Sequence, residues 1–160
     1  MKNNHINHSG DLHMIDISSK EVTERIAQAR GSIILNDKAF GSIIAMNNKK
    51  GDVLNTARIA GINSVKQTAS LIPLAHVIPI NSVIVDFEII ETENKINCTV
   101  SVKSEGKTGV EIESLVGVEI ALMTIYDMCK YLDKGMTITD IKLVSKTGGK
   151  SGDYLANNNG

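Results

Sequence analysis

Apolar and polar residues alternate in two runs of the chain, residues 83–89 and 96–102. A polar turn, residues 91–95, separates the two runs. A period of two places successive side chains on opposite faces of a strand. The two runs therefore predict an antiparallel hairpin with one buried face.

A longer apolar stretch has no such alternation. Residues 107–130 read KTGVEIESLVGVEIALMTIYDMCK and predict a helix of about six turns that stops near Gly135. A second helix is predicted between Asp52, a candidate N-cap, and Pro73, because proline disfavours helix at the residue before it. Residues 38–46 predict a short third helix.

The segment of residues 20–35 fits two patterns. Ser-Ser-Lys-Glu at 18–21 resembles a capping box, which favours a helix. The alternation over 23–29 and the Ser-Ile-Ile-Leu run at 32–35 favour a strand, and we interpret the segment as extended. A last strand is predicted over 137–145.

These elements follow one another as strand, helices, two hairpin strands, long helix and strand. The order predicts an α+β fold, a ferredoxin-like sandwich in which helices pack on one face of an antiparallel sheet. Residues 13–154 are expected to form a single domain, because 160 residues suit one domain and no boundary divides them. Residues 1–12 and 155–160 are polar and are predicted to be flexible tails.

Composition and charge exclude several classes of function. The net charge is −1 and aromatic residues make up 3% of the chain, which argues against a nucleic-acid surface. No apolar run approaches the roughly 20 residues of a membrane-spanning helix. Cys98 and Cys129 are isolated and no signal peptide is recognisable, so we expect a protein of the reducing cytoplasm.

The first candidates for chemistry are Asp127 and Lys130, which are three residues apart and therefore neighbours on one face of a helix. Such a pair is either a structural ion pair or an acid/base couple. Basic residues also recur at turns and element ends beside glycine, where backbone N–H groups can approach a phosphate. If they converge they form a polyphosphate site, and otherwise they are solvated surface groups. These residues are Lys50, Arg58, Lys107, Lys146 and Lys150.

Two other patterns are rejected. Gly149-Lys150-Ser151 resembles the end of a P-loop, but Val144 stands where the first glycine would be, and the segment follows a strand without opening a helix. His5 and His8 lie in a polar tail, so we predict no metal site.

Taken together, several stretches resemble one family, the cyclic pyranopterin monophosphate synthases of molybdenum cofactor biosynthesis (the MoaC family). The resemblance runs from about residue 12 to residue 154. One departure is Ala75-His76-Val77, where the family has Cys-His-Pro, so the histidine is kept while its neighbours change. The matching stretches are His13–Ser18, Lys50–Val53, Ala57–Gly61, Leu71–Leu74, Gly106–Glu111, Leu122–Lys130 and Gly148–Asp153.

The resemblance implies a reaction and roles for residues. A phosphorus–oxygen lyase is expected, which converts 3′,8-cyclo-7,8-dihydro-GTP to cyclic pyranopterin monophosphate and pyrophosphate. It also implies a homo-hexamer, a trimer of dimers with active sites at the dimer interface. Asp127 and Lys130 are expected to be the catalytic pair. Substrate contacts are expected from Leu74, Ala75, His76, Ile112, Glu113, Lys50, Arg58, Lys107, Glu111 and Lys146.

The chemistry of these residue types suits that reaction. Moving protons on a purine-derived ring and closing a cyclic phosphate are general acid/base steps. We expect a lowered pKa for Lys130, placed near other cations and partly desolvated, and a positioning or proton-accepting role for Asp127. Lysines can stabilise the departing pyrophosphate. We predict no required cofactor, with Mg²⁺ possible as a companion of the triphosphate.

Helix geometry adds a prediction about assembly. Glu113 and Asp127 are separated by about 21 Å along one helix. One small pocket cannot use both ends, so we predict sites shared between subunits. Two other classes stay open: a non-catalytic ligand-binding module, because this fold does not determine function, and a purely structural oligomer, which leaves the glycine–lysine turns unexplained.

Overall fold

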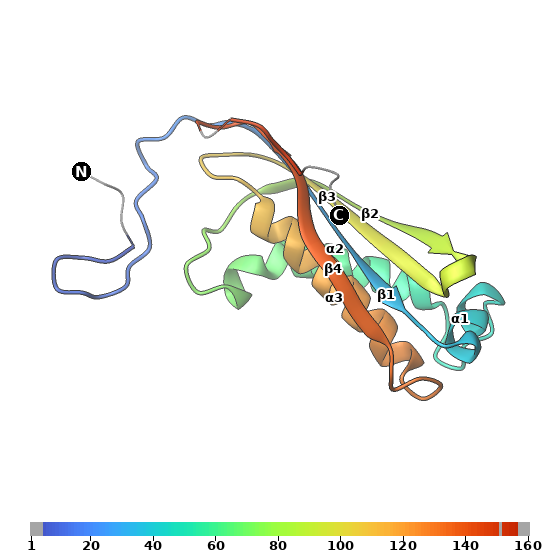
Figure 1. The fold of residues 1–160 in the computed structure, drawn as a ribbon. Helices are drawn as coiled ribbons and strands as arrows, with labels where there is room; N and C mark the ends of the chain where they lie inside the picture. Colours follow the sequence, from blue (N-terminus) through green and yellow to red (C-terminus); the bar gives the residue numbers. More distant parts are fainter. Residues whose placement is uncertain (1–4, 151, 157–160) are drawn as a thin grey trace.

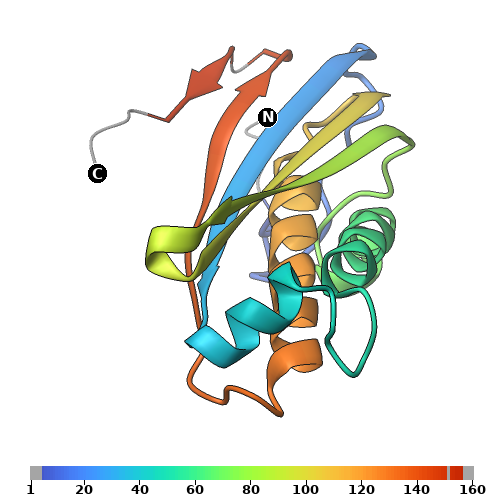
Figure 2. The ribbon, with the colours of Figure 1, turned by 90° about the vertical axis from the view of Figure 1, so that its right-hand side faces the viewer.

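A five-stranded sheet forms one layer of the structure, and two long helices cover one of its faces (Figures 1 and 2). The computed structural model describes residues 5–150 and 152–156. The strand order is β2-β3-β1-β4-β5. The strands are β1 (Thr23–Ile34), β2 (Ile80–Ile90), β3 (Lys95–Gly106), β4 (Thr137–Thr147) and β5 (Tyr154–Leu155), and the helices are α1 (Asp37–Ile44), α2 (Val53–Leu71), α3 (Glu111–Cys129) and a 3₁₀ turn, η1 (Glu91–Glu93).

This arrangement confirms the predicted α+β class and the ferredoxin-like order. The main elements follow as β1-α2-β2-β3-α3-β4, with the short α1 before α2 and the short β5 at the end. All strand pairings are antiparallel, and the predicted hairpin β2–β3 turns through η1. The segment of residues 20–35 contains β1, because its backbone pairs with β3 on one side and β4 on the other.

The core lies between the sheet and the helix layer. Gly117 of α3 lies at a close contact with both β3 and α2: a Cβ there would lie 2.9 Å from methyl groups of both Val100 and Val65. This close packing holds α3 against the sheet and so fixes the side chains at its two ends. Residues with 0% exposure include Ile96, Cys98, Val100 and Val102 of β3 and Val118, Ala121, Leu122 and Ile125 of α3.

The predicted end of the central helix is wrong. α3 ends at Cys129 and not near Gly135. The backbone N–H groups of Leu132 and Asp133 both donate to the carbonyl of Cys129, which closes a tight turn and stops the helical ladder. Gly135 lies in the loop beyond this turn, where its N–H donates to the Asp133 carboxylate.

Some residues of the two predicted tails form backbone pairs. Leu155, expected to begin the C-terminal tail, pairs with Ser145 as part of β5. In the predicted N-terminal tail, Ile6 and Leu12 form an isolated bridge. Residues 1–4 and 157–160 of the predicted tails, and Ser151 of the rejected P-loop match, lie outside the described residues.

Candidate active site

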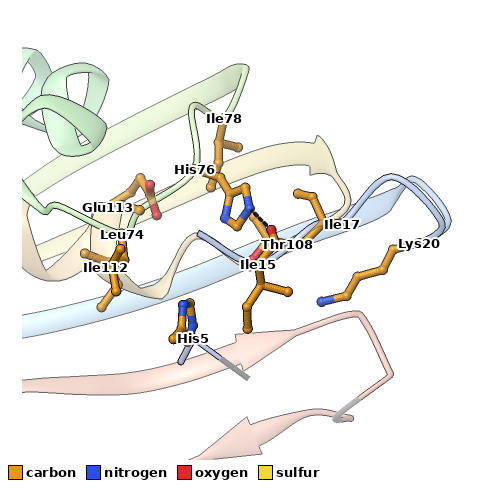
Figure 3. A pocket seen from close by; sticks show the side chains of 12 residues that line it. His5, Ile15, Ile17, Lys20, Leu74, His76, Ile78, Thr108, Ile112 and Glu113 are labelled. Carbon is orange, nitrogen blue, oxygen red and sulfur yellow. Dashed lines mark hydrogen bonds between the residues drawn. The ribbon is translucent and has the colours of Figure 1, made fainter. Parts of the chain in front are cut away.

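A cavity of about 250 Å³ opens at the N-terminal end of α3 (Figure 3). Three parts of the chain form it: the connection from α2 to β2, the start of α3, and the segment before β1. We refer to it as the His76 cavity. It brings together five of the predicted substrate contacts, Leu74, Ala75, His76, Ile112 and Glu113.

His76 ties the N-terminal segment to this cavity. Its Nε2 lies 2.8 Å from the backbone carbonyl oxygen of Ile15, and Figure 3 shows the ring directed at that oxygen. A carbonyl oxygen only accepts hydrogen bonds, so Nε2 carries the proton and donates. Lys107 secures the same segment at a second point, because its Nζ donates to the carbonyl of Ser18 at 2.6 Å. The segment containing Ile15 and Ser18 is therefore held beside the cavity by two of the predicted substrate contacts.

Glu113 places a buried carboxylate in the cavity. The residue lies in the first turn of α3 and is only 4% exposed. Burial raises the pKa of this carboxyl above its ordinary value, and the charge of the nearby Glu111 acts in the same direction. Within the described part of the chain, Glu113 has no ion-pair partner. A buried carboxylate without a cation is suited to accept hydrogen bonds from a ligand.

The free energy of unfolding of the Glu113→Gln variant, relative to that of the wild type, should increase as pH rises. Because the folded-state pKa of Glu113 is raised, the wild type loses stability as pH rises from the ordinary pKa of a glutamate through the folded-state pKa, and a neutral amide does not. Urea unfolding at acidic and at neutral pH measures the difference in free energy of unfolding between variant and wild type. Glu119→Gln, on the exposed side of the same helix, is the control. A difference that stays constant with pH would contradict the expected ionisation of Glu113.

A second cavity, of about 540 Å³, adjoins the first and shares Lys20, Thr108 and Gly109 with it. We refer to it as the basic cavity, because its cationic side chains outnumber the two carboxylates, Glu21 and Glu111, that also line it. Three predicted substrate contacts meet here, Lys107, Glu111 and Lys146. The cationic residues are Lys20, Arg25, Lys107, Lys146 and Lys150.

Arg25 is a lining residue that the sequence analysis missed. The turn after β4 is shaped around it: a Cβ on Gly149 would overlap the Arg25 guanidinium, and a Cβ on Gly148 would overlap the carbonyl oxygen of Glu24. Both glycines have φ near +90°, at +87° and +88°, which other residues rarely adopt. The Gly-Gly pair was visible in the sequence, but the pairing of β1 with β4 that brings Arg25 to it was not.

Asp127, Lys130 and Lys50 form a third group, the Asp127 cluster. Asp127 accepts from Lys130 Nζ at 2.7 Å through Oδ1 and from Lys50 Nζ at 3.1 Å through Oδ2. Lys50 Nζ also donates to the backbone carbonyl of Asp127 at 2.7 Å. The hydrogen bond from Lys130, then that from Lys50, lowers the pKa of Asp127 below its ordinary value. Asp127 is therefore an ionised carboxylate between two ammonium groups.

The predicted lowering of the Lys130 pKa is wrong. The hydrogen bond and charge of Asp127 raise the pKa of Lys130 above its ordinary value. The Lys130 side chain is 54% exposed, so desolvation, which would lower the pKa, is the weaker effect. In this arrangement Lys130 is a protonated ammonium, suited to donate a proton or a hydrogen bond.

The three groups do not all meet within one chain. Glu113 lies in the first turn of α3 and Asp127 in its last turn, so the helix itself separates the cavities from the Asp127 cluster. Arg58 lies outside the two cavities and the Asp127 cluster. It donates to the carbonyl of Val85 at 3.0 Å, and its guanidinium lies 5.4 Å from the Phe87 ring centre. Lys50, expected to contact phosphate, lies in the Asp127 cluster and not in the basic cavity.

The fold and these groups define a ferredoxin-like α+β domain with adjoining cavities suited to a small anionic molecule, and with a separate carboxylate–ammonium cluster. A family model described as the MoaC family matches residues 14–149. The chain belongs to the MoaC family, as the sequence motifs indicated. This is an enzyme family of molybdenum cofactor biosynthesis, and the chain has a role in that process.

Among residues 5–150 and 152–156, no helix is long and apolar enough to cross a membrane. In the same part of the chain, no group of three or more His, Cys, Asp or Glu side chains is arranged to hold a metal ion.

Proposed function

We propose that this chain is a cyclic pyranopterin monophosphate synthase. It would convert (8S)-3′,8-cyclo-7,8-dihydroguanosine 5′-triphosphate to cyclic pyranopterin monophosphate and pyrophosphate. The observation that carries the proposal is that two cavities with shared lining residues lie side by side in a MoaC-family chain. One cavity presents cations for a triphosphate, and the other presents a buried carboxylate and a histidine for a heterocycle.

The basic cavity would hold the phosphate groups. Lys107, Lys146 and Arg25 offer ammonium and guanidinium donors, which form strong hydrogen bonds with phosphate oxygens. Closing the cyclic phosphate requires a substrate hydroxyl to lose its proton and attack the α-phosphorus. The bond from that phosphorus to the bridging oxygen of the β-phosphate breaks, and pyrophosphate leaves with the bonding electron pair. Cations that contact the departing group stabilise the charge that builds on it.

The His76 cavity would hold the purine-derived ring. The Glu113 carboxylate can accept two parallel hydrogen bonds from the ring N–H and amino group of a guanine-derived heterocycle. His76 would form its contact through the ring nitrogen that does not face Ile15. Burial of Glu113 strengthens its hydrogen bonds and keeps water from competing for the carboxylate.

The Asp127 cluster would supply proton transfer from a second subunit. In this proposal Lys130 donates a proton or hydrogen bond, and Asp127 orients both ammonium groups. Because Asp127 lies at the far end of α3 from Glu113, a dimer is the simplest assembly that joins them, and we propose a homo-hexamer built as a trimer of such dimers. Mg²⁺ would enter with the triphosphate as part of the substrate, and the two buried free cysteines are compatible with the reducing cytoplasm that we expect.

Neutral replacements of three lysines predicted to contact substrate should weaken catalysis. Lys107→Met and Lys146→Met remove cations that line the basic cavity, and Lys50→Met removes one that contacts Asp127. Each should lower kcat/KM by the equivalent of about 1–3 kcal/mol, the range for a hydrogen bond to a charged group. Lys38→Met on the exposed side of α1 is the control. Unchanged kinetics in all three variants would show that these lysines are solvated surface groups that do not contact the substrate.

The proposed function is tested by incubating the purified protein with the cyclised GTP substrate. Pyrophosphate and the pterin product should both appear. GTP itself, which lacks the 3′,8 bond, is the matched control and should yield neither. Tight binding of the cyclised substrate without product would favour a ligand-binding module and would overturn the proposed synthase activity.

A further inference from the structure

Three consecutive residues of the loop between α1 and α2 contact residues at or just beyond the C-terminal end of α3. Asn48 donates from Nδ2 to Cys129 Sγ at 3.6 Å. The next residue, Lys49, donates its backbone N–H to the Tyr131 hydroxyl at 3.2 Å, and its Nζ lies 3.8 Å from the centre of that ring. Lys50 then reaches Asp127. The two residues before Lys50 are therefore both held by hydrogen bonds, and these bonds fix the backbone position of Lys50.

Asn48 is the most buried residue of this loop segment, with 7% exposure, and both ends of its amide are used. Its Oδ1 accepts the backbone N–H of Lys50 at 2.9 Å, and its Nδ2 also donates to Ser42 Oγ at 3.2 Å. Burial raises the pKa of the Cys129 thiol to about 11, so the thiol stays neutral and accepts from the amide. Asn48 thus connects α1, α3 and the backbone of Lys50 through one side chain.

We propose that Asn48 is a positioning residue that holds the Lys50 ammonium against Asp127. A lysine side chain is a flexible chain of four methylene groups, so the location of its charge depends on a fixed backbone. Asn48 supplies that fixed point by bonding to the Lys50 N–H, and the Tyr131 contact to Lys49 reinforces it. The inference rests on the proposed function for its kinetic consequence only, because the geometry is independent of the reaction.

A purely structural role for Asn48 makes a different prediction. Tethering the loop for stability alone would lower the free energy of unfolding but leave the environment of Asp127 unchanged in the folded protein. Positioning changes that environment, because Lys50 is the second of the two cations that contact the carboxylate, after Lys130. The charge state of Asp127 therefore reports whether Asn48 acts on Lys50.

The first experiment is an NMR titration of the Asp127 carboxyl carbon in the full-length chain. Lys50→Ala should raise the Asp127 pKa toward its ordinary value, since it removes a hydrogen bond that lowers it. Asn48→Ala should raise it in the same direction, and should add nothing in a chain that already carries Lys50→Ala. An Asp127 titration that Asn48→Ala leaves unchanged overturns the proposal, whatever happens to the kinetics.

The second experiment measures turnover of the cyclised substrate. Asn48→Ala should lower kcat by roughly 10- to 100-fold with little change in KM, because misplacing a catalytic group by about 1 Å costs on the order of 10²-fold. Asn48→Ser keeps a hydroxyl that can accept the Lys50 N–H and should recover part of the loss. Tyr131→Phe, which removes only the hydroxyl, should give a smaller loss and remains informative if Asn48→Ala folds poorly.

Asn36→Ala is the matched control for loss of stability. Asn36 also uses both ends of its amide, as the N-cap of α1 and as a donor to the carbonyl of Leu132, but it does not contact Lys50. Its replacement should reduce the free energy of unfolding without changing kcat or the Asp127 titration. An equal fall in kcat from Asn36→Ala and Asn48→Ala would overturn the proposal. Absence of wild-type turnover would instead count against the proposed function, and the titration would still decide the role of Asn48.

Discussion

Asp127→Asn and Lys130→Ala should each reduce turnover of the cyclised substrate by on the order of 10²–10⁴-fold, the range for removal of a general acid or base. Asp127 is ionised and holds Lys130 at 2.7 Å. Lys130→Ala therefore removes the donor, and Asp127→Asn removes the negative charge that orients it. The fold should remain intact, because both side chains are more than half exposed, and an exposed ion pair contributes little to stability.

The control is the ion pair of Lys95 with Glu93 on the β2–β3 turn, in which the Lys95 side chain is 22% exposed and the Glu93 side chain 58% exposed. Lys95→Ala removes a comparable ion pair away from the cavities and should leave kcat unchanged. Circular dichroism and urea unfolding would confirm that the variants fold. Near-wild-type kcat in Asp127→Asn or Lys130→Ala would remove the catalytic assignment and favour a binding module, in which Asp127→Asn leaves ligand affinity intact.

Mixing inactive Glu113→Ala protein with inactive Lys130→Ala protein should restore activity when subunits exchange. If one chain supplies Glu113 and its neighbour supplies Lys130, a mixed dimer contains one site with both defects and one with none. An equal mixture should then recover about a quarter of the wild-type activity, because the two halves of each site are drawn independently from a symmetric interface.

The control mixture combines Asp127→Asn with Lys130→Ala. These residues lie 2.7 Å apart and come from the same end of one helix, so every site in that mixture carries a defect. Mass spectrometry of differently labelled chains would establish that subunits exchange. If exchange is complete and the mixture of Glu113→Ala and Lys130→Ala stays inactive, the shared-site proposal is wrong.

Much of the fold could be predicted from the pattern of apolar residues. The β2–β3 hairpin followed from alternation with a period of two, and α3 followed from a long apolar stretch without that alternation. β1 was harder, since a strand with partners on both sides can satisfy local helix signals as well. The end of α3 was predicted several residues beyond its actual position. The turn after Cys129 depends on backbone hydrogen bonds that the pattern of side chains does not predict.

The candidate site was only partly predictable. Motif resemblance selected five residues of the His76 cavity and three residues of the basic cavity. Arg25 was missed because strand register brings it to the Gly148–Gly149 turn, and register is a property of tertiary structure. The direction of the Lys130 pKa shift was wrong because the ion pair with Asp127 outweighs burial at an exposed helix end.

The central claim is that this chain closes a cyclic phosphate and expels pyrophosphate. A ³¹P NMR time course of the wild-type protein with the cyclised GTP substrate tests it most directly, because each phosphorus atom is followed through the reaction. We predict that the triphosphate signals disappear while pyrophosphate and one cyclic phosphodiester appear in equal amounts. Triphosphate signals that persist although the substrate is bound to the protein, or orthophosphate in place of pyrophosphate, would contradict the proposed reaction.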